Sequence, residues 1–226
     1  MCRIPIPARQ FTVPPYMIVI RSFDVNKPGE DAETLRGGVA GGTILKGCLK
    51  VGDEIAIRPG YITRNTQTGQ HNWKEIRSQI TTLKADENHL MYAVPGGLLA
   101  VGMKVDPQFT RSDNMVGHII GHPDQMPQVY IEIDVQTTFL KRIVGTKDDN
   151  NRVENIKEGE ILLINISSTS CGGTVIKVAE KQARILLTKH VCANIDGKIA
   201  LSRKIDRNYR LIGWGVIKAG YEKRNR

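Results

Sequence analysis

The stretch RGGVAGGTILKGCLKVGDEI, residues 36–55, decides the fold of this chain. Its glycine-rich first part leads into a predicted strand in which apolar and other residues alternate. The chain then turns at Gly52 into a second predicted strand with the same two-residue period. Such alternation on both sides of a tight turn is typical of antiparallel strands, and the glycines allow the backbone of a narrow barrel to bend. We therefore interpret the stretch as one corner of a small β-barrel.

The same glycines do not form a phosphate-binding loop. No Gly-Lys-Ser/Thr follows them at the required spacing, and no helical pattern begins after them to present a helix N-terminus to a phosphate. The motifs Asp-x-x-Gly and Asn-Lys-x-Asp, which serve magnesium and guanine in GTP-binding domains, occur nowhere in the 226 residues. We expect no cofactor in this chain.

The rest of the chain shows the same alternation and little helical periodicity. In the first half, strands are predicted at residues 17–20, 43–49, 54–57, 76–83, 98–105 and 114–121. In the second half, they are predicted at residues 128–135, 160–166, 173–179, 182–187, 197–203 and 209–218, with turns at 157–159, 171–173 and 196–197. This spacing predicts an all-β chain of two consecutive small antiparallel β-barrels.

Two prolines in the segment HPDQMP, residues 122–127, interrupt the strand pattern. We place the domain boundary there, with a first barrel over residues 1–122 and a second barrel over residues 123–226. Polar stretches at residues 61–73 and 146–157 are predicted to be surface loops. The chain has no apolar run of membrane-spanning length, and its N-terminal segment is too proline-rich for a signal peptide, so we expect a cytoplasmic protein that binds no membrane.

Neither the cysteines nor the polar motifs predict a metal site or catalysis. Cys2, Cys48, Cys171 and Cys192 are widely separated and form no CxxC pair, which favours reduced thiols over a zinc site shared with histidines. No Ser/His/Asp set stands in a catalytic context, so we expect the chain not to be an enzyme. An enzyme with an unrecognised site remains a third hypothesis behind the two given below.

Positive charge is concentrated toward the C-terminus. Residues 1–122 hold 14 Lys/Arg against 11 Asp/Glu, whereas residues 123–226 hold 18 against 12. From residue 197 onward there are 9 Lys/Arg and only 2 Asp/Glu. This excess predicts a surface for a nucleic-acid backbone, and the alternative is a solvated basic rim.

Long strings of residues also carry a family resemblance. They include SFDVNKPG at 22–29, the glycine-rich stretch at 37–52, YAVPGGL at 92–98, KIALSRK at 198–204 and RLIGWG at 210–215. In this order they resemble the gamma subunit of eukaryotic initiation factor two, over nearly all of the chain. The resemblance implies two barrels of the translation-factor type. Members of that family begin with a GTP-binding domain, so GTP and magnesium are implied for that missing domain and not for these residues.

The resemblance implies initiator methionyl-tRNA as a partner, delivered to the small ribosomal subunit. By similarity to elongation factor Tu, the aminoacyl end would lie on the first barrel at Gly41, Gly42, Thr43, Ile44, Gly96 and Gly97. Glycines permit close approach of a ribose, but the alternative is that both pairs bend strands. The tRNA phosphates would meet Arg203, Lys204, Arg207, Arg210 and Lys218. Trp214 could stack on a base or fill the core.

The resemblance also implies that the first barrel docks the alpha subunit of the same factor. The candidate loop contains Asp24, Asn26, Lys27 and Pro28, and the alternative is a simple hairpin connection. The beta subunit would bind mainly through the missing domain. The predicted function is thus the non-catalytic part of an initiation factor subunit that binds initiator tRNA and docks alpha. The alternative is a protein-docking scaffold whose tRNA binding is lost without the GTP-binding domain.

Overall fold

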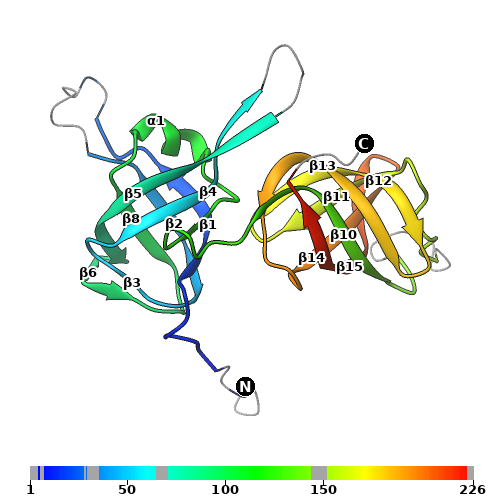
Figure 1. Ribbon diagram of the computed structural model, residues 1–226, viewed down its shortest axis with the longest axis horizontal. Coiled ribbons are helices and arrows are strands. Elements are labelled where there is room, and N and C mark those ends of the chain that lie inside the picture. The colour runs from blue at the N-terminus through cyan, green and yellow to red at the C-terminus, as the bar shows by residue number, and fades with distance from the viewer. Residues whose placement is uncertain are drawn as a thin grey trace. The chain divides into compact units, whose positions relative to one another are not determined.

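The computed structural model describes residues 5, 8–27, 29, 36–64, 71–143 and 152–222, and it confirms the all-β prediction of two antiparallel barrels (Figure 1). The chain divides into two compact units. The first comprises Met1–Arg58 with Glu75–Met126, and the second comprises Pro59–Lys74 with Pro127–Arg226. The division after Met126 falls inside the two-proline segment.

The first barrel closes in the strand order β4-β9-β1-β2-β8-β5, because β5 pairs back to β4. A short strand, β6, extends this sheet beyond β5, and β3 pairs with β7 beside it. The bounds are β1 Tyr16–Phe23, β2 Val39–Lys46, β3 Leu49–Lys50, β4 Glu54–Arg64, β5 His71–Ala85, β6 Asn88–Leu90, β7 Tyr92–Ala93, β8 Leu99–Met103 and β9 Ile119–Gly121.

Alternating side chains of these strands fill the first barrel. Met17 and Val19 of β1 are fully buried with Ile55 and Ile57 of β4, while Ile18 and Arg58 beside them are only partly buried. The turn at Gly52 is confirmed, since this residue has a φ of 93° and open space where a Cβ would stand. The inward set forms one contiguous apolar core.

A short helical segment between β8 and β9 departs from the prediction. The sequence suggested a strand over residues 114–121, but β9 covers only Ile119–Gly121. It is preceded by α1, Pro107–Thr110, and by the 3-10 turn η1, Arg111–Asp113. Asp106 caps α1 by accepting a 2.9 Å hydrogen bond from the Gln108 amide, and Pro107 fits the first helical position because it needs no amide partner.

The second barrel closes in the order β10-β13-β12-β11-β14-β15. Its strands are β10 Val129–Phe139, β11 Ile161–Ile166, β12 Thr169–Ala179, β13 Gln182–Cys192, β14 Lys198–Ile205 and β15 Asn208–Tyr221. All its pairings are antiparallel, and its inward side chains form a second core. The predicted turns at 157–159 and 196–197 are confirmed by the positive φ of Gly159 and Asp196.

The predicted turn at residues 171–173 is wrong, because these residues lie inside β12. The chain reverses instead at Ser167, whose φ is 53°. A Cβ on Gly173 would stand 2.4 Å from a methyl group of Ile164 and 2.7 Å from one of Ile185. This glycine therefore makes room for core side chains within a strand and does not mark a bend.

One of the two predicted loops is shorter than expected, and the other is not wholly at the surface. Within the polar stretch 61–73, β4 continues to Arg64 and β5 begins at His71, and the residues between them lie outside the described ranges. In the stretch 146–157, residues 152–157 are described, and Ile156 packs into the core of the second barrel.

A polar cluster ties three strands of the second barrel together. Arg184 of β13 donates to both carboxylate oxygens of Asp134 on β10, at 2.7 and 2.8 Å, and to the Tyr221 hydroxyl of β15 at 3.0 Å. Tyr221 in turn donates to Asp134 at 2.9 Å. The Arg184 hydrogen bonds, followed by that of Tyr221, hold the pKa of Asp134 below its usual value. The buried carboxylate of Glu132 lies 3.6 Å from the same guanidinium.

Candidate nucleic-acid interface

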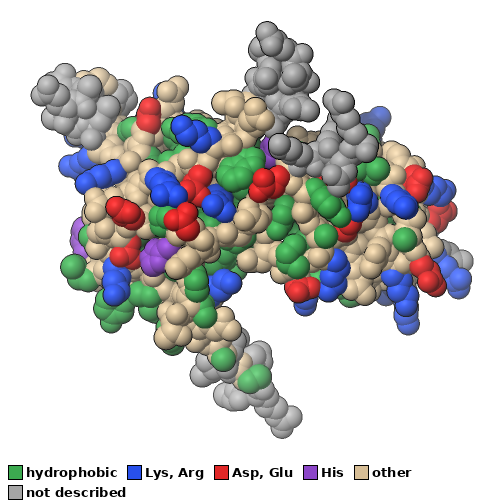
Figure 2. Space-filling view, viewed as in Figure 1, with side chains coloured by type: hydrophobic (Ala, Val, Ile, Leu, Met, Phe, Trp, Pro, Cys, Tyr) green, Lys and Arg blue, Asp and Glu red, His purple; other side chains and the backbone are tan. Residues whose placement is uncertain are grey.

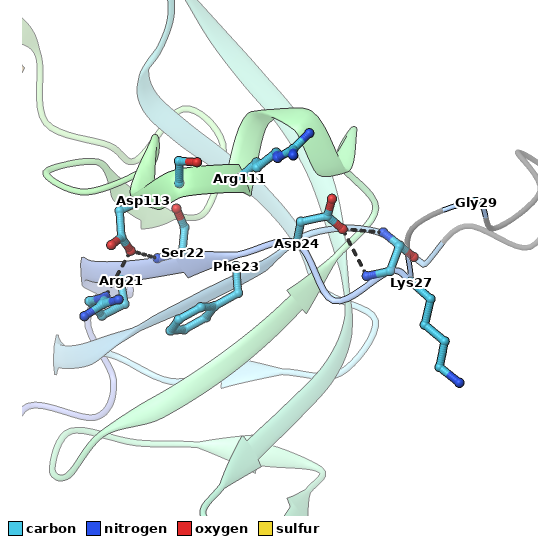
Figure 3. A pocket seen from close by; sticks show the side chains of 10 residues that line it. Arg21, Ser22, Phe23, Asp24, Lys27, Gly29, Arg111 and Asp113 are labelled. Carbon is cyan, nitrogen blue, oxygen red and sulfur yellow. Dashed lines mark hydrogen bonds and ion pairs between the residues drawn. The ribbon is translucent and has the colours of Figure 1, made fainter.

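A pocket of about 600 Å³ opens on the first barrel where β1 ends beside η1 (Figure 3). It is formed by the end of β1, the loop that follows and the helical segment before β9. The lining residues are Arg21, Ser22, Phe23, Asp24, Asn26, Lys27, Gly29, Arg111, Ser112 and Asp113. Three of the four predicted alpha-docking positions, Asp24, Asn26 and Lys27, therefore belong to its wall.

Strand alternation presents a cation and an aromatic ring on the same side of β1. Ser22 is buried, whereas Arg21 and Phe23 on either side of it are exposed. The Arg21 guanidinium carbon lies 5.5 Å from the centroid of the Phe23 ring, and Figure 3 shows the two side chains next to each other. A planar group entering the pocket would meet this pair.

Gly41 lies next to that pair on the neighbouring strand. It is paired with Arg21 in the β1–β2 register, and a Cβ placed on it would stand 3.6 Å from atoms of both Arg21 and Phe23. This is ordinary contact distance, so the barrel itself does not require a glycine here. One predicted position for the aminoacyl end is therefore adjacent to the pocket.

Asp113 fastens the helical segment to β1. Its Oδ1 accepts hydrogen bonds from the Ser22 amide at 2.9 Å and from Arg21 Nε at 3.0 Å, and the Ser22 hydroxyl accepts from the Met115 amide. The Ser22 amide and Arg21 together lower the pKa of Asp113. Ser112 and Asp113 both have positive φ, 55° and 59°, a conformation that side chains disfavour. The two strained residues fix this wall of the pocket.

The loop after β1 is braced by its own side chains. Asn26 donates to Asp24 Oδ1 and to the Arg36 carbonyl, both at 2.8 Å, and its own side-chain oxygen accepts from the Arg36 amide at 2.6 Å. Hydrogen bonds from the amide and side chain of Asn26 lower the pKa of Asp24. Lys27 points away from the other labelled side chains (Figure 3), and Pro28 lies outside the described residues.

The pocket combines the groups that a nucleotide end requires. Arg111 supplies positive charge for phosphate, Arg21 could do so only by sharing its guanidinium with Asp113, and the Phe23 ring offers a stacking surface. The carboxylates of Asp24 and Asp113 supply acceptors of the kind that bind ribose hydroxyls. We found no cluster of three or more His, Cys, Asp or Glu suited to a metal ion in the described ranges. The same part of the chain has no helix long and apolar enough to cross a membrane.

The predicted aminoacyl-end residues have different environments. Thr43 Oγ1 donates a 2.9 Å hydrogen bond to the Gly97 carbonyl, which joins β2 to the turn before β8. Gly97 has a φ of 73° with open space at its Cβ position, and a Cβ added to Gly96 would stand 3.4 Å from the Arg9 guanidinium. Ile44 is instead a core residue. A Cβ on Gly42 would lie only 2.0 Å from the Ile18 carbonyl, so this glycine is required by the pairing of β1 with β2.

The five predicted phosphate-binding residues are not equivalent either. Arg203 is bound to both carboxylate oxygens of Glu160 and to the carbonyls of Glu154 and Asn155. Lys218 pairs with Asp196 at 2.7 Å. Lys204 and Arg207 are exposed, and Arg210 is partly exposed. Figure 2 shows basic side chains interspersed with acidic ones on the visible face of the molecule.

Sequence reasoning missed Arg21, Phe23, Arg111 and Asp113. The alternation of Arg21, Ser22 and Phe23 in a strand could have indicated two outward groups. Nothing in the sequence indicated that η1, about ninety residues later, packs beside that strand end, because its helical turn was itself not predicted.

The chain is similar to known subunits of a translation initiation factor. Residues 131–217 match the family model described as initiation factor eIF2 gamma, C terminal. Eukaryotic translation initiation factor 2 subunit 3 of Drosophila melanogaster is 47% identical over 222 residues. The aligned region covers 96% of this chain and 46% of that relative, so the chain spans about half of the relative's length.

Proposed function

Because the chain belongs to the family of the gamma subunit of initiation factor eIF2, we propose that it receives the aminoacylated end of initiator methionyl-tRNA on its first barrel. A role as part of a translation initiation factor subunit follows from the family. In the proposal, the whole subunit delivers this tRNA to the small ribosomal subunit, and the beta subunit binds outside these residues.

The observation that carries the proposal is the pocket beside β1. It is large enough for a terminal nucleotide, and it sets Arg21 against the ring of Phe23 with Arg111 on the facing wall. Base stacking on an aromatic ring and pairing of a phosphate with arginine do not depend on base sequence. A site of this kind suits the invariant end of a tRNA.

The neighbouring positions extend the proposed site. Gly41 lies beside Arg21 and Phe23, and the Thr43–Gly97 hydrogen bond holds the open turn at Gly97 against the next residues of β2. An aminoacyl group could follow β2 from the pocket toward this turn. In this account Gly42 and Ile44 support the strand and do not touch the ligand.

On the second barrel, the proposal assigns phosphate contacts to Lys204, Arg207 and Arg210. Arg203 and Lys218 would each have to exchange a carboxylate partner for a phosphate, which adds a cost to binding. Each exposed cation that meets a phosphate releases counterions, so affinity would fall as salt rises.

Docking of the alpha subunit is a second candidate function of the loop after β1. The hydrogen bonds among Asp24, Asn26 and Arg36 hold these described residues together, which lowers the entropy that a partner must remove there. The exposed Val25 between Asp24 and Asn26 offers an apolar contact. A chain that binds alpha but no tRNA would fit the scaffold-only alternative.

The test is a fluorescence titration of labelled initiator methionyl-tRNA with the whole chain and its pocket variants. Phe23→Ala and Arg111→Ala should each weaken binding about tenfold, the value of one stacking or one charged contact. Arg142→Ala is the matched control, because Arg142 is an exposed arginine of the other barrel.

Equal affinities for the wild-type chain, both pocket variants and the control would remove the pocket from the proposal. The alpha subunit is titrated in parallel with Asn26→Ala, which breaks the brace of the loop. Alpha binding that is insensitive to this variant would place the docking surface elsewhere.

A further inference from the structure

The outer wall of the second barrel carries an apolar and aromatic surface on three adjacent strands. We call it the β15 face. Its members are Tyr209, Leu211 and Trp214 of β15, Lys198, Ala200 and Lys204 of β14, and Ile161 of β11.

A bulge at Ile212, where the β14–β15 register shifts between Leu201 and Ser202, brings Tyr209, Leu211 and Trp214 to the same outward face of β15. Ile212 and Ile217 of β15 and Leu201 of β14 are buried in the core, while Tyr209, Leu211 and Trp214 are 49%, 46% and 43% exposed. The sequence alternatives for Trp214 were stacking or a core position. Its exposure shows that it does not fill the core.

The neighbours of Trp214 leave its ring accessible. Across the ladder, Trp214 pairs with Ala200 on one side and Thr138 on the other, and both of these side chains are short. The glycines before and after it are buried, so they add no outward side chain. A flat ligand can therefore approach one face of the indole.

Lysines accompany the aromatic residues. Lys204 pairs directly with Tyr209, and Lys198 pairs with Val216 two residues beyond Trp214. Both lysines are exposed, and neither forms an ion pair with any other described residue. No carboxylate stands at the paired positions of Tyr209, Leu211 or Trp214. The charge of this face therefore complements an anion.

We propose that the β15 face binds a short stretch of unpaired RNA, with bases stacked on Trp214 and Tyr209 and phosphates beside Lys198 and Lys204. The two rings are five residues apart along an extended strand, about 16 Å, which leaves space for intervening nucleotides. Exposed aromatics on a small β-barrel, flanked by lysines, are the combination by which proteins hold single strands without reading their sequence.

This inference goes beyond the tRNA-end pocket and uses a different barrel, where it shares Lys204 with the phosphate contacts proposed above. Exposed aromatic side chains could also bind a protein partner. A polyanion is favoured here because lysines lie opposite Tyr209 and beyond Trp214 with no carboxylate at the paired positions. If the pocket variants bind tRNA as the wild type does, the inference about the β15 face is unaffected. If substitutions on the β15 face do not change oligonucleotide binding, the proposal about the pocket is unaffected.

The experiment uses the whole chain and a twelve-nucleotide oligouridylate, which has no stable pairing. Binding is followed by the tryptophan fluorescence of the wild type and by anisotropy of a labelled oligonucleotide for all variants. Trp214→Ala should weaken binding at least tenfold, and Trp214→Phe should recover most of the loss because a ring is restored. Ile195→Ala, a similarly exposed apolar residue of the same barrel, should bind as the wild type does.

Two further measurements separate stacking from general charge attraction. Lys204→Ala should reduce the slope of log affinity against log salt by about one, whereas Lys181→Ala, in the turn between β12 and β13, should not. Quenching of tryptophan emission by the oligonucleotide should disappear in Trp214→Phe, since Trp73 alone remains.

Three results would overturn the proposal. Equal oligonucleotide affinity of Trp214→Ala and Ile195→Ala would exclude stacking. Equally tight binding of a duplex of the same length, unaffected by Trp214→Ala, would reduce the interaction to backbone charge. Absence of oligonucleotide binding, together with alpha-subunit binding that Trp214→Ala abolishes, would assign the face to a protein.

Discussion

The Thr43 hydroxyl donates a 2.9 Å hydrogen bond to the Gly97 carbonyl, across 54 residues of sequence. Two positions that the resemblance to translation factors singled out separately are thus one local structure. The hydrogen bond holds a turn with positive φ at Gly96 and Gly97 against β2. The turn is therefore positioned before any ligand arrives, which is what a recognition surface requires.

Replacement of Thr43 by valine should cost about 1 kcal/mol of stability, the usual net value of one hydrogen bond. Valine keeps the shape of threonine and its preference for strands, so the change isolates the hydroxyl. Urea unfolding of the whole chain measures the loss. Thr138→Val on β10, an exposed threonine, is the control and should be neutral. If the two variants have equal stability, the Thr43 hydrogen bond does not support the turn.

Gly41 and Gly42 are adjacent but should respond oppositely to alanine. Gly42→Ala would place a Cβ 2.0 Å from the Ile18 carbonyl and should destabilise the chain by about 3 kcal/mol or prevent folding. Gly41→Ala meets atoms at 3.6 Å and should fold normally, while it narrows the approach beside Arg21 and Phe23. Thermal unfolding and tRNA titration of both variants check this. A Gly41→Ala chain that folds and binds tRNA normally would mean that the ligand does not approach there.

The Asp134 carboxylate should make the stability of the second barrel depend on pH in the acid range. Its pKa is lowered in the folded chain by Arg184 and Tyr221, so its contribution is present above the unfolded pKa of about 4 and is lost as pH falls through the lower folded value. Asp134→Asn should therefore destabilise the chain by about 2 kcal/mol at neutral pH, and this difference should shrink below about pH 4. Urea unfolding across that range tests the sign. If the stability difference between the wild type and Asp134→Asn grows as the pH falls, Asp134 does not stabilise the folded chain as a carboxylate.

Arg203 and Lys204 are adjacent in β14 but should affect different properties. Removal of the Arg203 side chain leaves Glu160 without its partner and should lower stability by about 2 kcal/mol. Lys204→Ala should leave stability unchanged and reduce the salt slope of tRNA binding by about one. Unfolding and salt titrations on both variants separate the two roles. A stable Arg203→Ala chain with a smaller salt slope would make Arg203 a phosphate ligand after all.

The strands were predictable because their signal is local. The alternation of the buried Ile133 and Val135 with the less buried Asp134 and Gln136 follows directly from one side of a strand facing the core. The turn expected at residues 171–173 was wrong because the sequence cannot tell a glycine that bends the chain from one such as Gly173 that makes room for Ile164. The helical segment at 107–113 was missed because it is short and is set by one capping residue, Asp106.

The candidate site was less predictable than the fold. Its pocket depends on Asp113 reaching β1 across about ninety residues, and no local pattern reports such a contact. The resemblance assigned both Gly41 and Gly42 to the aminoacyl end, but only Gly41 lies beside the pocket. The resemblance could not distinguish the two, because the role of Gly42 is set by the short distance from its Cβ position to the Ile18 carbonyl. Likewise, the charge excess after residue 197 gave no sign that Arg203 and Lys218 are held by carboxylates.

The most direct test compares initiator methionyl-tRNA with the same tRNA after deacylation, each titrated calorimetrically into the wild-type chain and into Arg111→Ala. If the first barrel receives the aminoacylated end, the wild type should prefer the charged tRNA, and the variant should bind both forms weakly. Equal binding of charged and uncharged tRNA by the wild type, unchanged in the variant, would contradict the central claim and leave only attraction to the tRNA backbone.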